Sequence, residues 1–305
     1  MTAAVQLTEL TVDFRRHGVS TRTHRALNAV TLEVAAQDFF ALIGPNGSGK
    51  TTAIHCVLGL LPPTSGSAHV FGARLEPGAP AFRDIVYVPE EAHYHDYLTV
   101  EEAIRYYAAL HGRPVTAPAL AAVLERLHLE TARHTLVSAC SKGMKQKVGL
   151  AQCLLQQPRL LVLDEPMRGL DPVAVREFRD VLAALHRDGV TVVMSSHVLP
   201  EVEQLATRVG ILDSGSLLSV SDLDALVSVD HDTYDVEVER LVTIPEYLTV
   251  EAVAGGLTRG ALPQARLYAF MDLVRAEGAE IRKCSLRKRT LEDSLVATLA
   301  EGRRA

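Results

Sequence analysis

The chain has 305 residues, of which 48% are apolar and 22% charged, a composition typical of a folded protein with one large and one smaller domain. Its formal net charge of −6 provides no general attraction to nucleic acid, so no nucleic-acid partner is expected. The four cysteines form no C-x-x-C pair, which gives no indication of a zinc site or a disulfide framework and fits a reducing compartment. No window approaches 18 consecutive apolar residues, so no membrane span is predicted.

Two segments near the N-terminus alternate apolar and polar residues, which predicts two strands. The first carries Leu10, Val12 and Phe14 on one face, and the second spans 30–34. Between them, residues 15–25 contain several cations and no acid, namely Arg15, Arg16, His17, Arg22, His24 and Arg25. The first interpretation is a solvated hairpin loop, and the alternative is contact with a nucleotide or with anionic headgroups. Phe14 fits either the core or a site that stacks on a planar base.

A glycine-rich loop follows the apolar run 39–43 and precedes a helical segment at 53–60. The loop reads Gly44-Pro45-Asn46-Gly47-Ser48-Gly49-Lys50-Thr51-Thr52, and its strand–loop–helix context supports the pattern G-x-x-x-x-G-K-[ST]. Its backbone N–H groups and the helix N-terminus predict a polyphosphate site. Lys50 supplies positive charge to the outer phosphates, and the Thr51 hydroxyl is placed to ligate Mg²⁺. The alternative is a glycine-rich turn before an ordinary helix.

Residues 92–157 predict a helical insertion. It follows a short strand, Ile85–Val88, that ends in Pro89-Glu90-Glu91. Thr99 and Glu102 have capping-box spacing and begin a helix to about Leu110. Apolar spacing over 120–127 predicts a second helix. The segment Cys140-Ser141-Lys142-Gly143-Met144 leads into a third, which stops near Pro158.

Two carboxylates end a second buried strand. The run Leu160–Leu163 is continuously apolar, as in a parallel strand buried on both faces, and Asp164 and Glu165 follow it. Acids at the carboxyl end of a strand in an open α/β sheet lie where ligands bind. A turn containing Asp171 leads into the next helix, and the strand at 191–196 ends at His197.

A hairpin at 209–218 is predicted to end the large domain, and from about residue 226 the pattern changes. A strand near 234–238, a helix from 267 to just before Gly278, a strand at 281–286 and a helix at 291–299 predict a small α/β appendage without a chemical motif. Its basic residues are Arg282, Lys283, Arg287, Lys288 and Arg289. They fit a solvated face, or alternatively a contact with lipid headgroups or an acidic partner.

With these motifs in order, the chain resembles the ATP-binding subunit of an ABC (ATP-binding cassette) transporter over about residues 5–225. The motif order and their conjunction make the resemblance specific. Gly44–Thr52 matches the phosphate loop (Walker A), Leu160–Asp164 matches Walker B, Cys140–Met144 occupies the place of the family signature, Gly169–Asp171 matches the D-loop, His197 matches the switch histidine, Glu90 falls at the Q-loop glutamine, and Phe14 falls at the adenine-stacking aromatic.

The resemblance implies ATP as the substrate and Mg²⁺ as the metal. Asp164 then holds Mg²⁺ opposite Thr51, with Glu90 accepting from metal-bound water. Glu165 is the general base or water-orienting residue, and His197 contacts the γ-phosphate and the attacking water. Such phosphoryl transfer depends on positioning and charge stabilisation.

The resemblance also implies a head-to-tail dimer with two sandwiched ATP molecules. Ser141 and Gly143 face the γ-phosphate bound by the other subunit, and Asp171 links the two sites. The partner is a second copy of the chain or a paralogous ATPase subunit. Integral membrane permease subunits supply the span, which places this chain peripherally on the cytoplasmic face of the cell membrane.

Some positions depart from the family pattern. Cys140, Lys142 and Met144 replace signature residues, and Glu90 adds negative charge near the γ-phosphate. Arg168 replaces the usual small residue before the D-loop. Segments 88–91, 141–147 and 195–203 are similar to a bacterial branch whose ATPases pair with separate membrane subunits that export drugs, lipids or polysaccharides.

We therefore expect an α/β fold with a P-loop NTPase (RecA-like) core, an N-terminal antiparallel β portion and a helical subdomain at about 92–157. The ATPase domain spans 1–225, and 226–305 forms the small C-terminal α/β appendage. Two alternatives stay open. One is a soluble ABC ATPase without a transport role, for example of the iron–sulfur assembly type, and the other is a module that holds ATP without hydrolysing it. Glu165 argues against the second.

Overall fold

The computed structural model describes residues 3–16, 22–75, 80–112 and 114–302. The chain divides into two compact units, Met1–Leu223 with Leu295–Ala305, and Asp224–Ser294. The domain limits predicted from the sequence, 1–225 and 226–305, stay a prediction. Within the described ranges, no helix combines the length and the apolar character needed to cross a bilayer.

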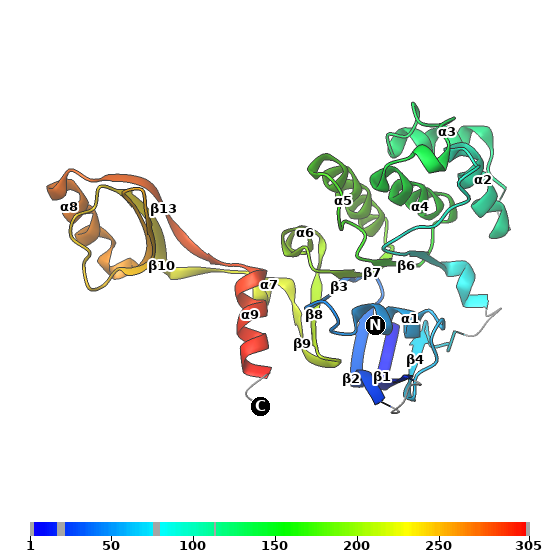
Figure 1. Cartoon of the computed structure of the whole chain (residues 1–305), viewed down its shortest axis with the longest axis horizontal. Coiled ribbons are helices and arrows are strands. Elements are labelled where there is room, and N and C mark those ends of the chain that lie inside the picture. The colour runs from blue at the N-terminus through cyan, green and yellow to red at the C-terminus, as the bar shows by residue number, and fades with distance from the viewer. Residues whose placement is uncertain (1–2, 17–21, 76–79, 113, 303–305) are drawn as a thin grey trace. The chain divides into compact units, whose positions relative to one another are not determined.

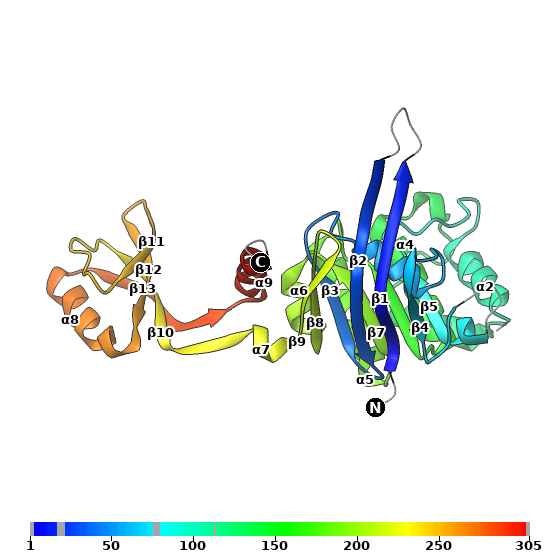
Figure 2. The same cartoon turned by 90° about the horizontal axis from the view of Figure 1, so that it is seen from below.

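A three-stranded antiparallel sheet forms the N-terminal β portion of the first unit (Figure 2). Its strand order is β2 (Arg22–Ala35), β1 (Ala3–Arg16) and β4 (Ser65–Val70). Phe14 lies opposite His24 in the β1–β2 register. The strands extend further into the basic segment than the sequence predicted, and His17 lies outside the described residues.

A six-stranded sheet forms the centre of the first unit, and five of its strands are parallel. Its sixth strand pairs antiparallel at the edge. The order is β5 (Ile85–Val88), β6 (Leu160–Asp164), β7 (Thr191–Ser196), β3 (Phe39–Ile43), β8 (Arg208–Asp213) and β9 (Ser216–Asp222). The parallel register brings the carboxyl ends of β3, β5, β6 and β7 to one edge. The glycine loop, Glu90, Glu165 and His197 directly follow these ends.

The first unit is layered, with the six-stranded sheet in the middle (Figure 1). One apolar core joins the antiparallel sheet, α1 (Lys50–Val57) and one face of the central sheet through residues such as Leu7, Ile54 and Val162. On the other side lie α4 (Lys142–Gln156), α5 (Pro172–Arg187) and α6 (Leu199–Leu205). Since both faces are covered, β3, β6 and β7 are buried along their whole length and are mostly apolar.

The predicted helical insertion is confirmed as α2 (Val100–Leu110), α3 (Ala117–Arg126) and α4. Thr99 and Glu102 form the predicted capping box at the start of α2. The Glu101 carboxylate holds the insertion together, because it binds Arg105 in the next turn and Arg133 beyond α3. Of two short 3₁₀ helices, Pro80–Asp84 precedes β5, and Val137–Ala139 lies between α3 and α4.

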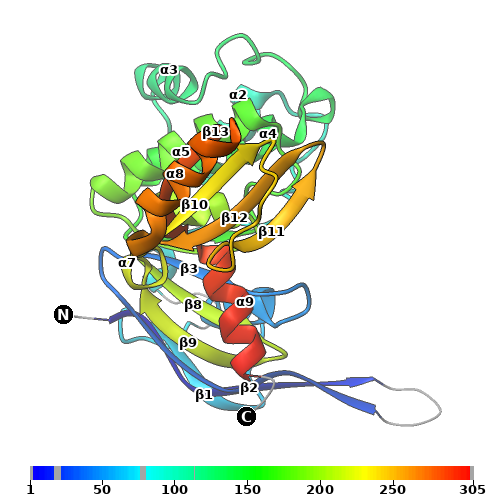
Figure 3. The ribbon, with the colours of Figure 1, turned by 90° about the vertical axis from the view of Figure 1, so that its left-hand side faces the viewer.

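The second unit is a four-stranded antiparallel sheet with one helix on one face (Figure 3). The strand order is β11 (Thr249–Ala254), β12 (Leu257–Pro263), β10 (Ser228–Glu239) and β13 (Glu280–Arg289). Phe270 and Val274 of α8 (Leu267–Glu277) pack on Val236 and Val238 of β10. The 3₁₀ turn Gln264–Arg266 precedes α8, and two further helices, α7 (Leu223–Leu226) and α9 (Leu291–Gly302), cross the limits of the unit. The hairpin of β11 and β12 is absent from the sequence prediction.

Candidate nucleotide site

The glycine loop wraps tightly around the N-terminus of α1. Gly44 has a φ of 151° and Gly49 a φ of 107°, both in the region that favours glycine. A Cβ on Gly44 would lie 2.0 Å from the Leu212 carbonyl oxygen, and one on Gly49 would lie 2.6 Å from that of Ala26. Neither position has room for a side chain, so the loop can take this shape only with glycine.

Lys50 is a buried cation held inside this loop. Its side chain is 6% exposed, and its Nζ donates to the carbonyl oxygens of Gly44 (2.9 Å) and Pro45 (3.2 Å). The Glu165 carboxylate lies 3.6 Å away. The Ser48 hydroxyl is also buried and has no partner among the described residues. A buried hydroxyl without a partner and a cation in a glycine cradle fit a bound phosphate group.

The two carboxylates after β6 are fixed by different groups. Asp164 Oδ1 accepts from Thr51 Oγ1 at 3.2 Å and from Ser195 Oγ at 2.5 Å. The Glu165 N–H donates to Ser195 Oγ at 2.9 Å. Glu165 itself has a left-handed backbone with a φ of 46°, a conformation that costs a non-glycine residue some strain. The hard oxygens of Thr51 and Asp164 fit Mg²⁺.

His197 and Glu165 contact each other directly. His197 Nδ1 lies 2.5 Å from Glu165 Oε2, and the His197 backbone N–H donates to the same oxygen at 3.2 Å. The carboxylate therefore orients the imidazole, whose other nitrogen is left for a further partner. Glu165 also faces Lys50, so one acid connects the phosphate loop to the end of β7.

A cavity of about 480 Å³ opens above the loop. Among the residues predicted as site residues, its lining includes Phe14, Asn46, Gly47, Gly49, Lys50, Thr51, Thr52, Glu90 and Glu165. Gly44, Pro45, Asp164 and His197 contact these lining residues from behind. Phe14 is 41% exposed, so its ring is available to the cavity. The cavity thus combines an aromatic ring, a phosphate loop and a pair of acids.

Three further predicted residues, Ser141, Gly143 and Asp171, do not line this cavity either and lie at the starts of two helices. Ser141 caps α4 by accepting from the Met144 N–H at 3.2 Å, and Asp171 caps α5 by accepting from Val173 and Ala174 at 3.0 Å. Gly143 lies beside α5, where a Cβ would come within 3.2 Å of the Ala174 Cβ. The structure therefore gathers these residues at helix N-termini, separate from the phosphate loop.

Sequence reasoning missed three residues of the site. Ser195 joins Asp164 to Glu165, as described above. Arg168 lines the cavity and pairs with Glu90 at 2.6 Å. Gln146 is 1% exposed, and its Nε2 donates to the carbonyl oxygens of Pro89 (3.2 Å) and Glu90 (2.8 Å). In the sequence, Ser195 stands two residues before His197, and Arg168 stands three residues after Glu165. These positions could have indicated both residues.

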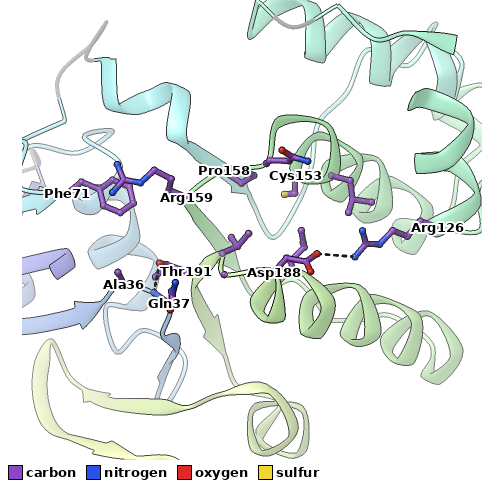
Figure 4. A pocket seen from close by; sticks show the side chains of 14 residues that line it. Ala36, Gln37, Phe71, Arg126, Cys153, Pro158, Arg159, Asp188 and Thr191 are labelled. Atoms are coloured by element: carbon purple, nitrogen blue, oxygen red, sulfur yellow. Dashed lines mark hydrogen bonds and ion pairs between the residues drawn. The ribbon is translucent and has the colours of Figure 1, made fainter. Parts of the chain in front are cut away.

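A second cavity, of about 590 Å³, lies at the opposite ends of the strands, next to Arg159 before β6 and Thr191 in β7 (Figure 4). Its charged groups have partners. The Arg159 guanidinium stacks at 3.9 Å on the Phe71 ring, and Arg126 pairs with Asp188 at 3.8 Å. Its described lining contains no glycine loop, so the first cavity is the better candidate for a phosphate ligand.

The fold and the site define a P-loop nucleoside triphosphatase. Residues 27–168 match the family model described as "ABC transporter". The lantibiotic transport ATP-binding protein SrtF of Streptococcus pyogenes is 34% identical over 65% of this chain and 85% of its own length. The bacitracin transport ATP-binding protein BcrA of Bacillus licheniformis is 29% identical over 99% of both chains. A solved ATP-binding subunit of an ABC transporter is 30% identical, with a TM-score of 0.63 over 73% of this chain and 91% of that one.

The chain belongs to the family of ABC transporter ATP-binding proteins. It is the subunit that hydrolyses ATP to energise membrane components. These similarities favour a transport function over the soluble ABC ATPase that was the alternative. The predicted fold class is likewise confirmed, since the match to the solved subunit covers the P-loop core.

Proposed function

We propose that ATP binds in the 480 Å³ cavity and that Glu165 directs its hydrolysis. The observation that carries this is the contact of Glu165 with both Lys50 (3.6 Å) and His197 (2.5 Å). Lys50 is released from the loop carbonyls to the β- and γ-phosphates. Glu165 accepts a proton from, or orients, the attacking water, and His197 holds the γ-phosphate side of that water.

Mg²⁺ is proposed to bind at Thr51 and Asp164, with Glu90 reaching it through water. When bound, the metal neutralises phosphate charge. Ser195 keeps Asp164 in place by donating to Oδ1, so the other carboxylate oxygen is left for the metal. Phe14, which also lines the cavity, is proposed to stack on adenine. Such a contact needs only a flat aromatic ring.

We infer that two chains complete the site head to tail. Ser141, Gly143 and the N-terminus of α4 have the chemistry to bind a γ-phosphate, because helix N-termini favour anions. Since these residues do not line the cavity of their own chain, the phosphate they bind belongs to the partner, which is a second copy or a paralogous subunit. Asp171 then connects the two sites. ATP stabilises the closed dimer, and hydrolysis releases it.

The membrane subunit is proposed to dock in an apolar groove of about 500 Å³ beside the Glu90 loop. The groove is lined by residues such as Leu60 and Leu110, which are 62% and 65% exposed. Tyr87 also lines it, and burial together with the Asp164 carboxylate raises the pKa of this phenol to about 12. Exposed leucines in a concave surface favour a protein partner. The docked chain lies peripherally on the cytoplasmic face of the membrane.

We propose export of an amphipathic peptide antibiotic or a similar amphiphile as the cargo class. The support is the likeness to the bacitracin and lantibiotic transport ATP-binding proteins, the first of which extends over the whole chain. The cargo itself is chosen by the membrane subunit. A soluble ABC ATPase of the iron–sulfur assembly type would have soluble partners instead. The experiment below therefore distinguishes this alternative from the transport function.

The test is affinity purification of the full chain from detergent-solubilised membranes of its host, followed by mass spectrometry. We expect a polytopic membrane protein in near one-to-one ratio. Leu60→Asp should lose this partner and keep basal ATPase activity, whereas Val253→Asp, a matched change at an exposed valine of β11, should keep both. Recovery with soluble proteins alone contradicts the transport assignment and leaves the ATPase chemistry standing.

A further inference from the structure

An ion pair lies in the wall of the nucleotide cavity. Glu90 Oε1 and Arg168 Nη1 are 2.6 Å apart, and both residues line the cavity together with Lys50 and Thr51. Glu90 follows β5, whereas Arg168 lies in the turn between β6 and α5. The pair therefore connects two loops that are 78 positions apart in the chain.

Each partner of the pair is anchored by its backbone. Gln146, a buried residue of α4, donates to the Glu90 carbonyl oxygen at 2.8 Å. The Arg168 N–H donates to the Glu165 carbonyl oxygen at 3.2 Å. The pair thus links α4 and the Glu90 loop to the turn that carries Glu165, the proposed catalytic residue.

The charges of the cavity give this pair a consequence for the ligand. A polyphosphate is repelled by a carboxylate in the wall, and the repulsion is strong where water is partly excluded. Arg168 lies within hydrogen-bond distance of that carboxylate, so the two side chains together contribute no net charge. Without Arg168, the Glu90 charge would face the phosphates uncompensated. Without Glu90, Arg168 would lie in the cavity wall as a cation without its carboxylate partner.

We propose that Arg168 is a positioning residue for ATP, which neutralises Glu90 and so lets the phosphates approach this wall of the cavity. The proposal rests on the proposed binding of ATP in this cavity. It explains how a carboxylate is tolerated beside a polyanion. Through Arg168, the Glu90 loop is also connected to the turn that carries Glu165. A movement of the Glu90 loop can therefore shift Glu165.

The experiment measures the Kd of ATP by isothermal titration calorimetry in EDTA, where no hydrolysis occurs. The variants are Arg168→Ala, Glu90→Gln, the double variant and Arg168→Lys in the full chain. We expect Arg168→Ala to raise Kd about tenfold, since one uncompensated charge now faces the phosphates. The double variant and Arg168→Lys should return to within about threefold of the wild-type Kd. Glu90→Gln should bind ATP as tightly as the wild type or tighter.

Controls separate charge from folding. Arg240→Ala removes a comparable surface ion pair, with Glu280 in the second unit, and should leave Kd unchanged. Circular dichroism melting of every variant reports stability, and the difference between Arg168→Ala and wild type should shrink as salt rises. An unchanged Kd in Arg168→Ala overturns the proposal, and so does a double variant that binds as weakly as Arg168→Ala.

The same titrations distinguish a failure of the proposed role of Arg168 from a failure of the proposed ATP site. Wild type and Lys50→Ala are titrated in the same series. A wild-type chain that does not bind ATP, or a Lys50→Ala variant that binds it equally well, removes the nucleotide site itself. Normal binding that Lys50→Ala abolishes, with no effect of Arg168→Ala, removes only the role of Arg168.

Discussion

Ser195 Oγ donates a hydrogen bond of 2.5 Å to Asp164 Oδ1 and accepts one of 2.9 Å from the Glu165 N–H. A hydroxyl without surface exposure at the end of β7 therefore fixes two consecutive acids at the end of β6. Because the hydroxyl both donates and accepts, it sets the orientation of one carboxylate and the backbone position of the other. Precise placement of these acids is what phosphoryl transfer requires of the protein.

Ser195→Ala should lower the kcat of ATP hydrolysis about tenfold or more, because partners that orient metal ligands and catalytic groups typically contribute on that scale. The Kd of ATP in EDTA should stay within about threefold of the wild-type value, since the hydroxyl does not contact the loop. Steady-state phosphate release and calorimetry give the two numbers.

Thr191→Val is the matched control for this change. Thr191 is a buried hydroxyl residue at the other end of the same strand, where Oγ1 accepts from the Gln37 N–H at 2.9 Å. Its loss should lower the melting temperature and leave kcat unchanged. If both variants lose activity equally, the effect comes from strand stability, and the positioning role of Ser195 is wrong.

Gly44→Ala should abolish ATP binding and destabilise the chain. A left-handed backbone costs a non-glycine residue about 1–3 kcal/mol, and the added Cβ would also overlap the Leu212 carbonyl oxygen at 2.0 Å. Gly72→Ala shares the positive φ but meets nothing within 4 Å, so it isolates the backbone cost. Thermal melts and ATP titrations of the two variants should separate clash from strain. If Gly44→Ala and Gly72→Ala have equal melting temperatures and equal ATP affinities, the tight loop at Gly44 is not required for ATP binding.

Glu101 should make the helical insertion sensitive to acid. Arg133 and Arg105 hydrogen-bond its carboxylate and lower its pKa to about 2, below the ordinary value of 4.5. The folded state thus binds the proton less readily than the unfolded state, so the stabilisation is complete above pH 4.5 and declines as the pH falls toward 2. Glu101→Gln should lower the melting temperature at pH 7.

The difference between the wild type and Glu101→Gln should be constant from neutral pH to about 5 and should shrink below it. Circular dichroism melts over that range measure it, with Glu125→Gln, an exposed acid of α3, as the control. A difference that grows as the pH falls would contradict the assigned sign.

Local patterns in the sequence predict the strands and loops that carry the proposed site residues. The glycine loop, Asp164, Glu165 and His197 each follow an apolar run, and parallel pairing brings the ends of such runs together. The capping box at Thr99 and the end of α8 at Gly278 are local signals too, and the structure has both. These features need only neighbouring residues.

Contacts between distant side chains could not be predicted in the same way. Arg168 and Glu90, or Ser195 and Asp164, meet only because the sheet brings separate loops into register. In the second unit, β11 is exposed along its length and lacks a clear apolar alternation, so the pattern did not predict the strand. The Gly255-Gly256 turn between β11 and β12 was the signal that should have predicted the hairpin.

The most direct test of the role of Glu165 compares wild type with Glu165→Gln, both in steady-state ATP hydrolysis and in size-exclusion profiles with ATP. We predict turnover by the wild type, turnover near background for Glu165→Gln, and a stable dimer of that variant in ATP. Lys50→Ala serves as the binding-deficient control and should show neither turnover nor dimer. Equal hydrolysis by wild type and Glu165→Gln would contradict the assignment of Glu165 as the residue that directs the attack on ATP.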